Sequence, residues 1–191
     1  MPDAPLFSDR LETALRFAAV AHRDQVRKSS DTPYVQHVVA VAWILDRAGF
    51  GEDVQVAGLL HDVVEDTPIT LDEVAAAFGP EVARIVDYCT EVKLDAEGRK
   101  RPWIDRKADH LAALAGAPIE ARAVTLADKL HNLTSLAHDL ARGVDAWSAF
   151  NADRDRVLAY YRAALEACGS DDPRLERLAD ACRDVLDGIL S

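Results

Sequence analysis

The sequence predicts an all-α fold. Apolar residues recur at spacings of three and four along most of the chain, and capping residues and glycines interrupt this pattern at regular places. There is no alternating strand pattern longer than a few residues, no tandem repeat and no low-complexity tract. Hydrophobic residues make up 49% of the 191 residues and charged residues 29%, which is typical of a folded globular chain. We therefore expect one helical domain spanning residues 1–191.

The N-terminal part of the chain predicts two amphipathic helices. Apolar residues at helical spacing between 11 and 21 follow Ser8, a residue type that favours the N-cap position. The same pattern returns between 38 and 45 and stops before a glycine, a common end of a helix. Asp53 can cap the next helix, which carries a stretch of polar residues described below.

Capping residues and helix-breaking glycines and prolines predict the boundaries of the later helices. Thr70 with Glu73 three residues on predicts a capping box, which opens a short helix to Phe78 before Gly79-Pro80 breaks the chain. Glycine and proline then mark a polar loop around 98–102. Further helices are expected over residues 80–90, 103–115, 118–140, 147–167 and 173–190.

Composition restricts the classes of partner. The net charge of -11 opposes nonspecific binding to nucleic acid or to an anionic membrane. No apolar run approaches the roughly 20 residues of a membrane span, and residues 1–9 lack the features of a signal peptide. The three cysteines have no metal-type spacing, which favours buried thiols in a reducing compartment. We expect a cytoplasmic protein whose oligomeric state the sequence does not determine.

Residues 59–67 contain the strongest candidate site. His61, Asp62, Glu65 and Asp66 lie among apolar residues, where an unpaired charge costs several kcal/mol. At roughly 100° per residue, His61 and Glu65 share one stripe of a helix and the two aspartates the next, so all four can face one cavity. Imidazole beside carboxylate suits manganese, iron or zinc. The alternative is a helix end with solvated acids.

Two further segments carry residues that can complete a metal site. His37 follows Pro33-Tyr34 at the start of a predicted helix, where a lone histidine is more often structural. Asp128 lies among leucines, with Asn132 one turn on and Ser135 on the same stripe. Two nitrogens and two oxygens would leave positions for water and a phosphate oxygen. The candidate ligands are His37, His61, Asp62 and Asp128.

Basic residues gather in two places despite the acidic composition. One set falls within nine residues that contain a single acid, Asp105, and the other lies near position 25. Such sets are compatible with a small polyphosphate ligand, although a solvated basic loop is the commoner explanation. The two sets are Arg99, Lys100, Arg101, Arg106 and Lys107, and Arg23, Arg27 and Lys28.

The order His, His-Asp, Asp on separate helices resembles the signature of the HD metal-dependent phosphohydrolases. More narrowly, the chain resembles the hydrolase domain of RelA/SpoT enzymes and their stand-alone relatives, the small alarmone hydrolases. The resemblance covers a core of about residues 8–140, and residues 144–191 would form C-terminal helices packed on it. The matching segments are Ala21-His22 to Gln25, Arg27-Lys28-Ser29, Pro33-Tyr34 to His37, Leu59 to Thr67, Phe78-Gly79 and Ala127 to Leu133.

This resemblance implies an all-helical HD bundle, a manganese ion and a role in the stringent response. The implied reaction removes the 3′-pyrophosphate from guanosine tetra- or pentaphosphate (ppGpp or pppGpp), leaving GDP or GTP. The four candidate ligands would hold the metal ion, and Glu65 with Asp66 would order and deprotonate the attacking water. The implied substrate contacts are Arg27, Lys28, Ser29, Tyr34, Asn132 and Ser135, with Arg106 and Lys107 as weaker additions.

The chain departs from the family pattern around the nucleotide pocket. Asp24, Ser30 and Val38 stand where the family usually has glycine, glycine and proline, and the loop over 27–37 is expected to be one residue longer. These departures leave the base open, so the substrate could be an adenine alarmone, a deoxynucleotide or a phosphorylated dinucleotide. A non-catalytic nucleotide-binding module is the alternative from a different class.

Overall fold

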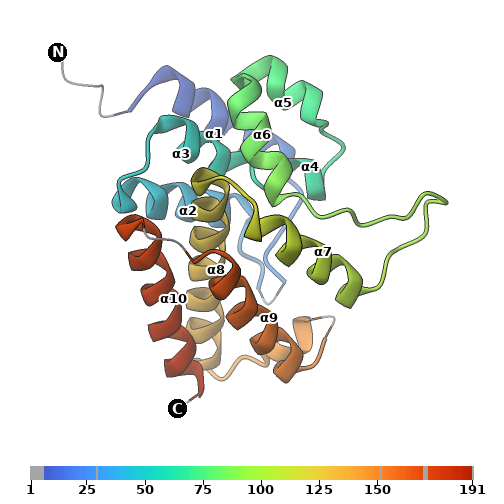
Figure 1. The fold of residues 1–191 in the computed structure, drawn as a ribbon, viewed down its shortest axis with the longest axis vertical. Coiled ribbons are helices and arrows are strands. Elements are labelled where there is room, and N and C mark those ends of the chain that lie inside the picture. Colours follow the sequence, from blue (N-terminus) through green and yellow to red (C-terminus); the bar gives the residue numbers. More distant parts are fainter. Residues whose placement is uncertain (1–6, 29, 151, 170–171, 191) are drawn as a thin grey trace.

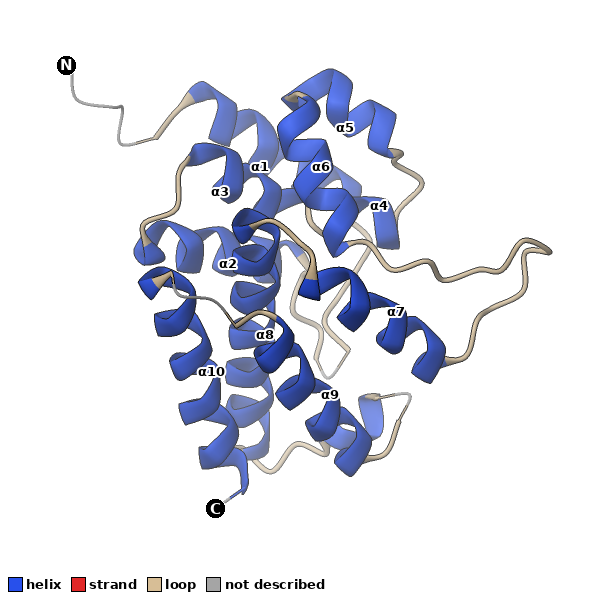
Figure 2. Cartoon of the chain, in the orientation of Figure 1, coloured by secondary structure: helices blue, strands red, loops and turns tan. Residues whose placement is uncertain are grey.

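The computed structural model describes residues 7–28, 30–150, 152–169 and 172–190, and these residues confirm the all-α prediction (Figure 2). They contain no strand, and their antiparallel pairing is limited to two isolated bridges, Val26 with Pro33 and Leu94 with Lys100. In chain order the elements are α1 (Asp9–Ala21), α2 (Val35–Ala48), α3 (Glu52–Leu60), α4 (Val63–Asp66), α5 (Leu71–Phe78), α6 (Pro80–Cys89), α7 (Trp103–Ala115), α8 (Ile119–Leu140), the 3-10 helix η1 (Ala146–Ala149), α9 (Arg154–Ala167) and α10 (Pro173–Leu190).

Helix α8 organises the packing (Figure 1). Helix α10 runs beside α8, and α2, α3 and α6 also pack against it, while α7 pairs with α9. Among the described residues, no helix is both long and apolar enough to cross a membrane. The largest buried apolar side chains, which form the core between these helices, include Leu45, Leu60, Ile85, Leu114, Leu126, Leu133 and Leu175.

Several helix ends confirm the local predictions. The side chain of Ser8 accepts a hydrogen bond from the backbone N–H of Leu11 at 3.1 Å, which caps α1. Thr70 and Glu73 form both bonds of a capping box at the start of α5. Gly49 ends α2 with a φ of 85°, a left-handed conformation that glycine adopts without steric cost.

Two other helix boundaries differ from the predictions. Helix α3 is capped by Gly51, so Asp53 lies inside its first turn instead of at the N-cap. Residues 147–167 do not form one helix, because a 3-10 turn precedes α9. Asp153 caps α9 by accepting a hydrogen bond from the backbone N–H of Arg156 at 3.0 Å, which sets a new helix start after the turn.

The polar stretch over 59–67 is not one continuous helix. Helix α3 ends at Leu60, His61 and Asp62 form a turn, and the short α4 follows. The Nδ1 atom of His61 lies 2.8 Å from the carbonyl oxygen of Gly58, at the end of α3 where carbonyl groups lack backbone partners. The helical stripes expected for this stretch are therefore wrong, and the turn itself directs the polar side chains.

Gly58 allows α3 to approach α2 closely. A Cβ atom at this position would lie 2.6 Å from Cδ1 of Leu45, which is fully buried. The close approach brings the rings of His37 and His61 to a centroid separation of 5.2 Å. A glycine in the core thus helps to place two imidazoles side by side.

Residues 90–102, here called the α6–α7 arm, project from the bundle (Figure 1). The arm folds back on itself through two backbone hydrogen bonds of 2.9 Å, from Asp95 N to Arg99 O and from Arg101 N to Lys93 O. The arm begins where α6 ends and finishes where α7 begins, so the residues nearest these two helices, here called its base, lie close to both.

Candidate metal centre and active site

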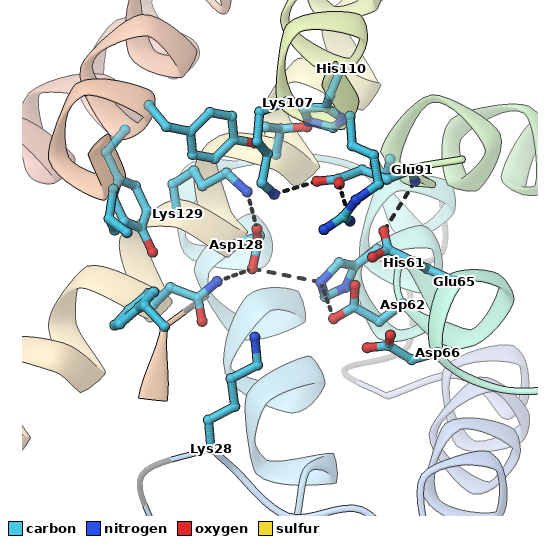
Figure 3. A pocket seen from close by; sticks show the side chains of 18 of the residues that line it. Lys28, His61, Asp62, Glu65, Asp66, Glu91, Lys107, His110, Asp128 and Lys129 are labelled. Atoms are coloured by element: carbon cyan, nitrogen blue, oxygen red, sulfur yellow. Dashed lines mark hydrogen bonds and ion pairs between the residues drawn. The ribbon is translucent and has the colours of Figure 1, made fainter. Parts of the chain in front are cut away.

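The four candidate ligands converge from separate elements. His37 lies in the first turn of α2, His61 and Asp62 lie in the turn after α3, and Asp128 lies in α8. Nε2 of His37 is 3.2 Å from Oδ1 of Asp128, and Nε2 of His61 is 3.0 Å from Oδ2 of Asp62. Figure 3 shows the three labelled ligands, His61, Asp62 and Asp128, facing one another.

Hydrogen bonds orient both imidazoles. Nδ1 of His61 donates to the carbonyl oxygen of Gly58, so in the neutral ring, the form that binds a metal ion, the lone pair lies on Nε2. Nδ1 of His37 lies 2.7 Å from Nδ1 of His131, so one of these atoms donates to the other. Within the described residues, Nε2 of His37 and Nε2 of His61 are buried and have no hydrogen-bond partner. Two buried nitrogens are thus directed at two carboxylates.

This donor set fits a divalent metal ion. Ligand atoms of His37, His61 and Asp128 all lie within 4.8 Å of one another, and Oδ2 of Asp62 is 3.6 Å from Nε2 of His37. Imidazole and carboxylate without thiolate suit first-row divalent ions. A cation would also compensate the cost of burying two carboxylates. The geometry therefore marks these residues as a candidate metal centre.

Electrostatics keep the carboxylates of this centre ionised. Burial raises the pKa of Asp62, but the positive charge of the adjacent His61 in its protonated form outweighs it and holds that pKa well below its usual range, and a bound cation in place of that proton would act in the same direction. Burial acts likewise on Asp128, whose pKa is held low by the ammonium group of Lys129, 2.7 Å from Oδ2. Anionic carboxylates are the form that binds metal ions.

Glu65 and Asp66 lie on α4, next to the candidate metal centre. Both side chains line the cavity that Asp62 and His61 also line, as Figure 3 shows. Burial and then the charge of Asp62 raise the pKa of Glu65, although Lys93 opposes the shift. A carboxylate with a raised pKa beside a metal centre is suited to accept a proton.

The cavity extends from these acids to α7 and α9. Its volume of about 440 Å³ falls within the range of small-molecule sites. Ser29 lies outside the described residues. The other predicted substrate contacts line the cavity, namely Arg27, Lys28, Tyr34, Asn132, Ser135, Arg106 and Lys107.

Two of these residues are tied directly to candidate ligands. The hydroxyl of Tyr34 donates to Oδ2 of Asp62 at 2.6 Å, and the amide of Asn132 donates to Oδ1 of Asp128. Nη2 of Arg27 in turn donates to Oδ1 of Asn132 at 2.7 Å. The loop between α1 and α2, here called the N-terminal loop, is therefore connected to α8 and to the metal centre through side chains.

Arg106 and Lys107 are not part of a solvated basic loop. Arg106 is buried on α7, and its Nη1 lies 2.8 Å from Oε2 of Glu91. Lys107 pairs with the other carboxylate oxygen of Glu91 and lies 4.5 Å from the ring centroid of Tyr160. These two cations line the cavity with part of their charge already balanced by an acid.

The cavity also contains residues that the sequence did not single out. Lys129 could have been predicted from the sequence, because a lysine next to Asp128 in a leucine-rich helix requires a charged partner. The other residues lie far apart in sequence, and no local pattern marks them. They are Glu91, Lys93, His110 and Tyr160.

Comparison with known proteins places this geometry in a family. The sequence profile of the HD domain matches residues 14–154. The chain belongs to the HD-domain family. Among its HD-domain relatives is the zebrafish (Danio rerio) guanosine-3′,5′-bis(diphosphate) 3′-pyrophosphohydrolase MESH1, which is 40% identical over 159 residues, covering 82% of this chain and 80% of the relative. Human MESH1 is 38% identical over 160 residues, with 82% of each chain covered.

Two solved structures share the fold of this chain over most of its length. A metazoan ortholog of SpoT, described as hydrolysing ppGpp and acting in starvation responses, superposes with a TM-score of 0.79 at 30% identity. That match covers 97% of this chain and 98% of the other. A Listeria monocytogenes EGD-e protein superposes with a TM-score of 0.67 at 35% identity, covering 81% of this chain and 96% of the other.

Proposed function

We propose that this HD-domain protein removes the 3′-pyrophosphate from guanosine tetra- or pentaphosphate, producing GDP or GTP and pyrophosphate. The MESH1 relatives, which carry this activity in their names and align over most of the chain, support this substrate. The observation that carries the chemistry is the pair of buried, unpartnered imidazole nitrogens facing two carboxylates, with Glu65 and Asp66 beside them in one cavity.

The proposed cofactor is one manganese ion held by His37, His61, Asp62 and Asp128. Two nitrogens and two oxygens without a thiolate favour such an ion over softer metals. When bound, a divalent cation acts as a Lewis acid that favours the ionisation of water and polarises a phosphate oxygen. Tyr34 and Lys129 hold the aspartate ligands in place, because each bonds to one of them within 2.7 Å.

Glu65 and Asp66 are the proposed water-activating pair. The water oxygen attacks the phosphorus next to O3′, the bond from that phosphorus to O3′ breaks, and the water proton passes to the carboxylate pair. O3′ leaves with the nucleoside diphosphate or triphosphate and takes up a proton, so pyrophosphate and the nucleotide are the products. Burial raises the pKa of Glu65 toward the range in which a carboxylate accepts a proton efficiently.

Basic residues of the cavity are the proposed contacts for the remaining phosphates and the ribose. Arg27 and Lys28 enter from the N-terminal loop, while Arg106 and Lys107 enter from α7. Several negative charges on the substrate would otherwise meet the acids of this site, so cations on the cavity wall offset the repulsion. Asn132 and Ser135 line the cavity from α8 and can donate hydrogen bonds to the ribose or its phosphates.

The test is turnover of guanosine tetraphosphate after dialysis against EDTA, with and without added manganese. Activity should be absent after chelation and return with manganese better than with magnesium. Glu65→Gln and Asp66→Asn should retain manganese and lose hydrolysis by a factor on the order of 10² or more. Asp72→Asn, which changes an exposed acid on α5, is the matched control and should remain active.

A nucleotide panel separates this proposal from its alternatives. The panel contains an adenine alarmone, a deoxynucleotide and a 2′- or 3′-phosphorylated dinucleotide. If one of these nucleotides were hydrolysed faster than guanosine tetraphosphate, it would replace guanosine tetraphosphate as the proposed substrate, and the metal-dependent chemistry would stand. Tight nucleotide binding without turnover of any of them would identify a binding module instead.

A further inference from the structure

The α6–α7 arm contacts the acid pair through Lys93. Its Nζ atom lies 3.1 Å from Oε1 of Glu65 and 3.1 Å from the backbone carbonyl oxygen of the same residue. It also forms an ion pair with Oδ1 of Asp66. On the other side of Glu65, Oε2 accepts a hydrogen bond of 3.1 Å from the backbone N–H of Glu91. Two groups from the base of the arm thus hold both carboxylate oxygens of Glu65, and one of them also holds Asp66.

Lys93 is itself fixed by the structure of the arm. Its carbonyl oxygen accepts the 2.9 Å hydrogen bond from Arg101 N that closes the arm on itself. Glu91, two residues earlier, is anchored by Arg106 and Lys107 of α7. The lysine therefore approaches α4 from a backbone that is also held by contacts within the arm and with α7.

The acid pair needs a cation at this place. Glu65 faces the charges of Asp62 and Glu91, and like charges at short range disfavour ionisation and push side chains apart. Of the cations in the described parts of the chain, Lys93 alone forms ion pairs with Glu65 and Asp66. The nearby Lys129 is paired with Asp128, on α8.

We propose that Lys93 is a positioning residue of the hydrolase, which holds the carboxylates of Glu65 and Asp66 together, ionised and oriented to receive the proton of the attacking water. This inference rests on the proposed function of the acid pair. Lys93 contacts none of the four candidate metal ligands through a hydrogen bond or an ion pair, so its role is separate from metal binding.

The test compares Lys93→Met, which keeps most of the length and removes the charge, with Lys93→Arg, which keeps the charge. Lys93→Met should lower kcat by about tenfold or more, a part of the full effect of a general base, and change KM less. Lys93→Arg should recover much of the loss. Arg99→Met removes a charge from the exposed tip of the same arm and should leave kcat unchanged. Manganese affinity, measured by calorimetry, should be equal in all four proteins.

The pH profile provides a readout that a merely structural role would not move. The charged groups that act on Glu65 are Asp62, Lys93 and Glu91, and Asp66 shares the same lysine, so loss of the lysine leaves these acids without the cation that pairs with Glu65. The acidic limb of kcat/KM should therefore move to higher pH in Lys93→Met and stay in place in Lys93→Arg. Unchanged kcat and an unchanged limb in Lys93→Met would overturn the inference. A rise in KM alone would do so as well, since it would make Lys93 a substrate contact.

A measurement without substrate separates this inference from the proposed function. Glu65 can be followed by carbon NMR in protein labelled at glutamate side-chain carboxyls, with Glu65→Gln assigning its signal. The pKa of Glu65 should rise in Lys93→Met relative to the wild type and to Arg99→Met. If the wild type failed to hydrolyse guanosine tetraphosphate, the proposed function would fail, while this titration would still decide whether Lys93 controls the acid pair. Identical titration curves in wild type and Lys93→Met would refute it.

Discussion

Manganese is expected to stabilise the folded protein through the four candidate ligands. The ligands come from α2, the turn after α3, and α8, so they meet only in the folded chain and the ion should bind the native state selectively. Free manganese at about 100 times its Kd adds about 2.7 kcal/mol of stability. For a chain of this size about 1 kcal/mol shifts Tm by roughly 2–4 °C, so Tm should rise by roughly 5–11 °C.

The assay is a thermal melt followed by circular dichroism, first in EDTA and then with increasing manganese. Asp62→Asn is the test variant, because asparagine can still accept the hydrogen bond from Tyr34 but lacks the anionic ligand. Its Tm, compared with its own value in EDTA, should rise much less than that of the wild type. His138→Gln, which changes an exposed histidine near the end of α8, should keep the full rise. A wild-type Tm that did not respond to millimolar manganese would refute the metal centre.

Three further predictions follow from individual contacts. Arg27→Ala should raise KM for guanosine tetraphosphate more than it lowers kcat, and raised salt should weaken substrate binding by the wild type more than by the variant, in steady-state assays at two ionic strengths. The pKa of His110 is lowered to about 4 by burial and by the charge of Lys129. Between about pH 6.5 and 4, His110 then binds a proton only in the unfolded chain. Lowering the pH through this range should therefore reduce the free energy of unfolding of the wild type, by up to about 1.4 kcal/mol per pH unit more than in His110→Gln, as measured by urea unfolding. Gly58→Ala should cost about 1–3 kcal/mol in the same assay, because its Cβ would lie 2.6 Å from Cδ1 of Leu45; wild-type stability in this variant would show that the core can shift.

The helices and many of their ends were predictable because their signals are local. Ser8, Gly49 and the Thr70–Glu73 box each act on a backbone within a few residues, so the sequence around them is sufficient. The boundaries that were wrong, such as the start of α9, depend on which of several polar residues becomes the N-cap. Asp153 takes that role here, and the spacing of apolar residues alone does not reveal it.

The candidate site was predictable only in part. The sequence by itself determined the chemistry available, since His61-Asp62, Glu65-Asp66 and Asp128 among apolar residues imply compensated charges, and these residues together made His37 a candidate ligand. The sequence did not determine how α3 ends. A hydrogen bond from the imidazole of His61 to the carbonyl oxygen of Gly58 and a turn at Asp62 direct the side chains, where a continuous helix was expected.

Only the tertiary structure decided which partners these residues have. Lys93 meets Glu65 across a separation of 28 residues in sequence, and His131 meets His37 across 94. Arg106 lies in a basic run for which solvation is the commoner explanation, yet it is buried against Glu91. Periodicity reports which face of a helix is buried, but it carries no information about which segments meet there. The identity of a charged partner depends on the packing of whole helices. The contact of Lys93, on the α6–α7 arm, with Glu65 and Asp66 could therefore be found only in the folded structure.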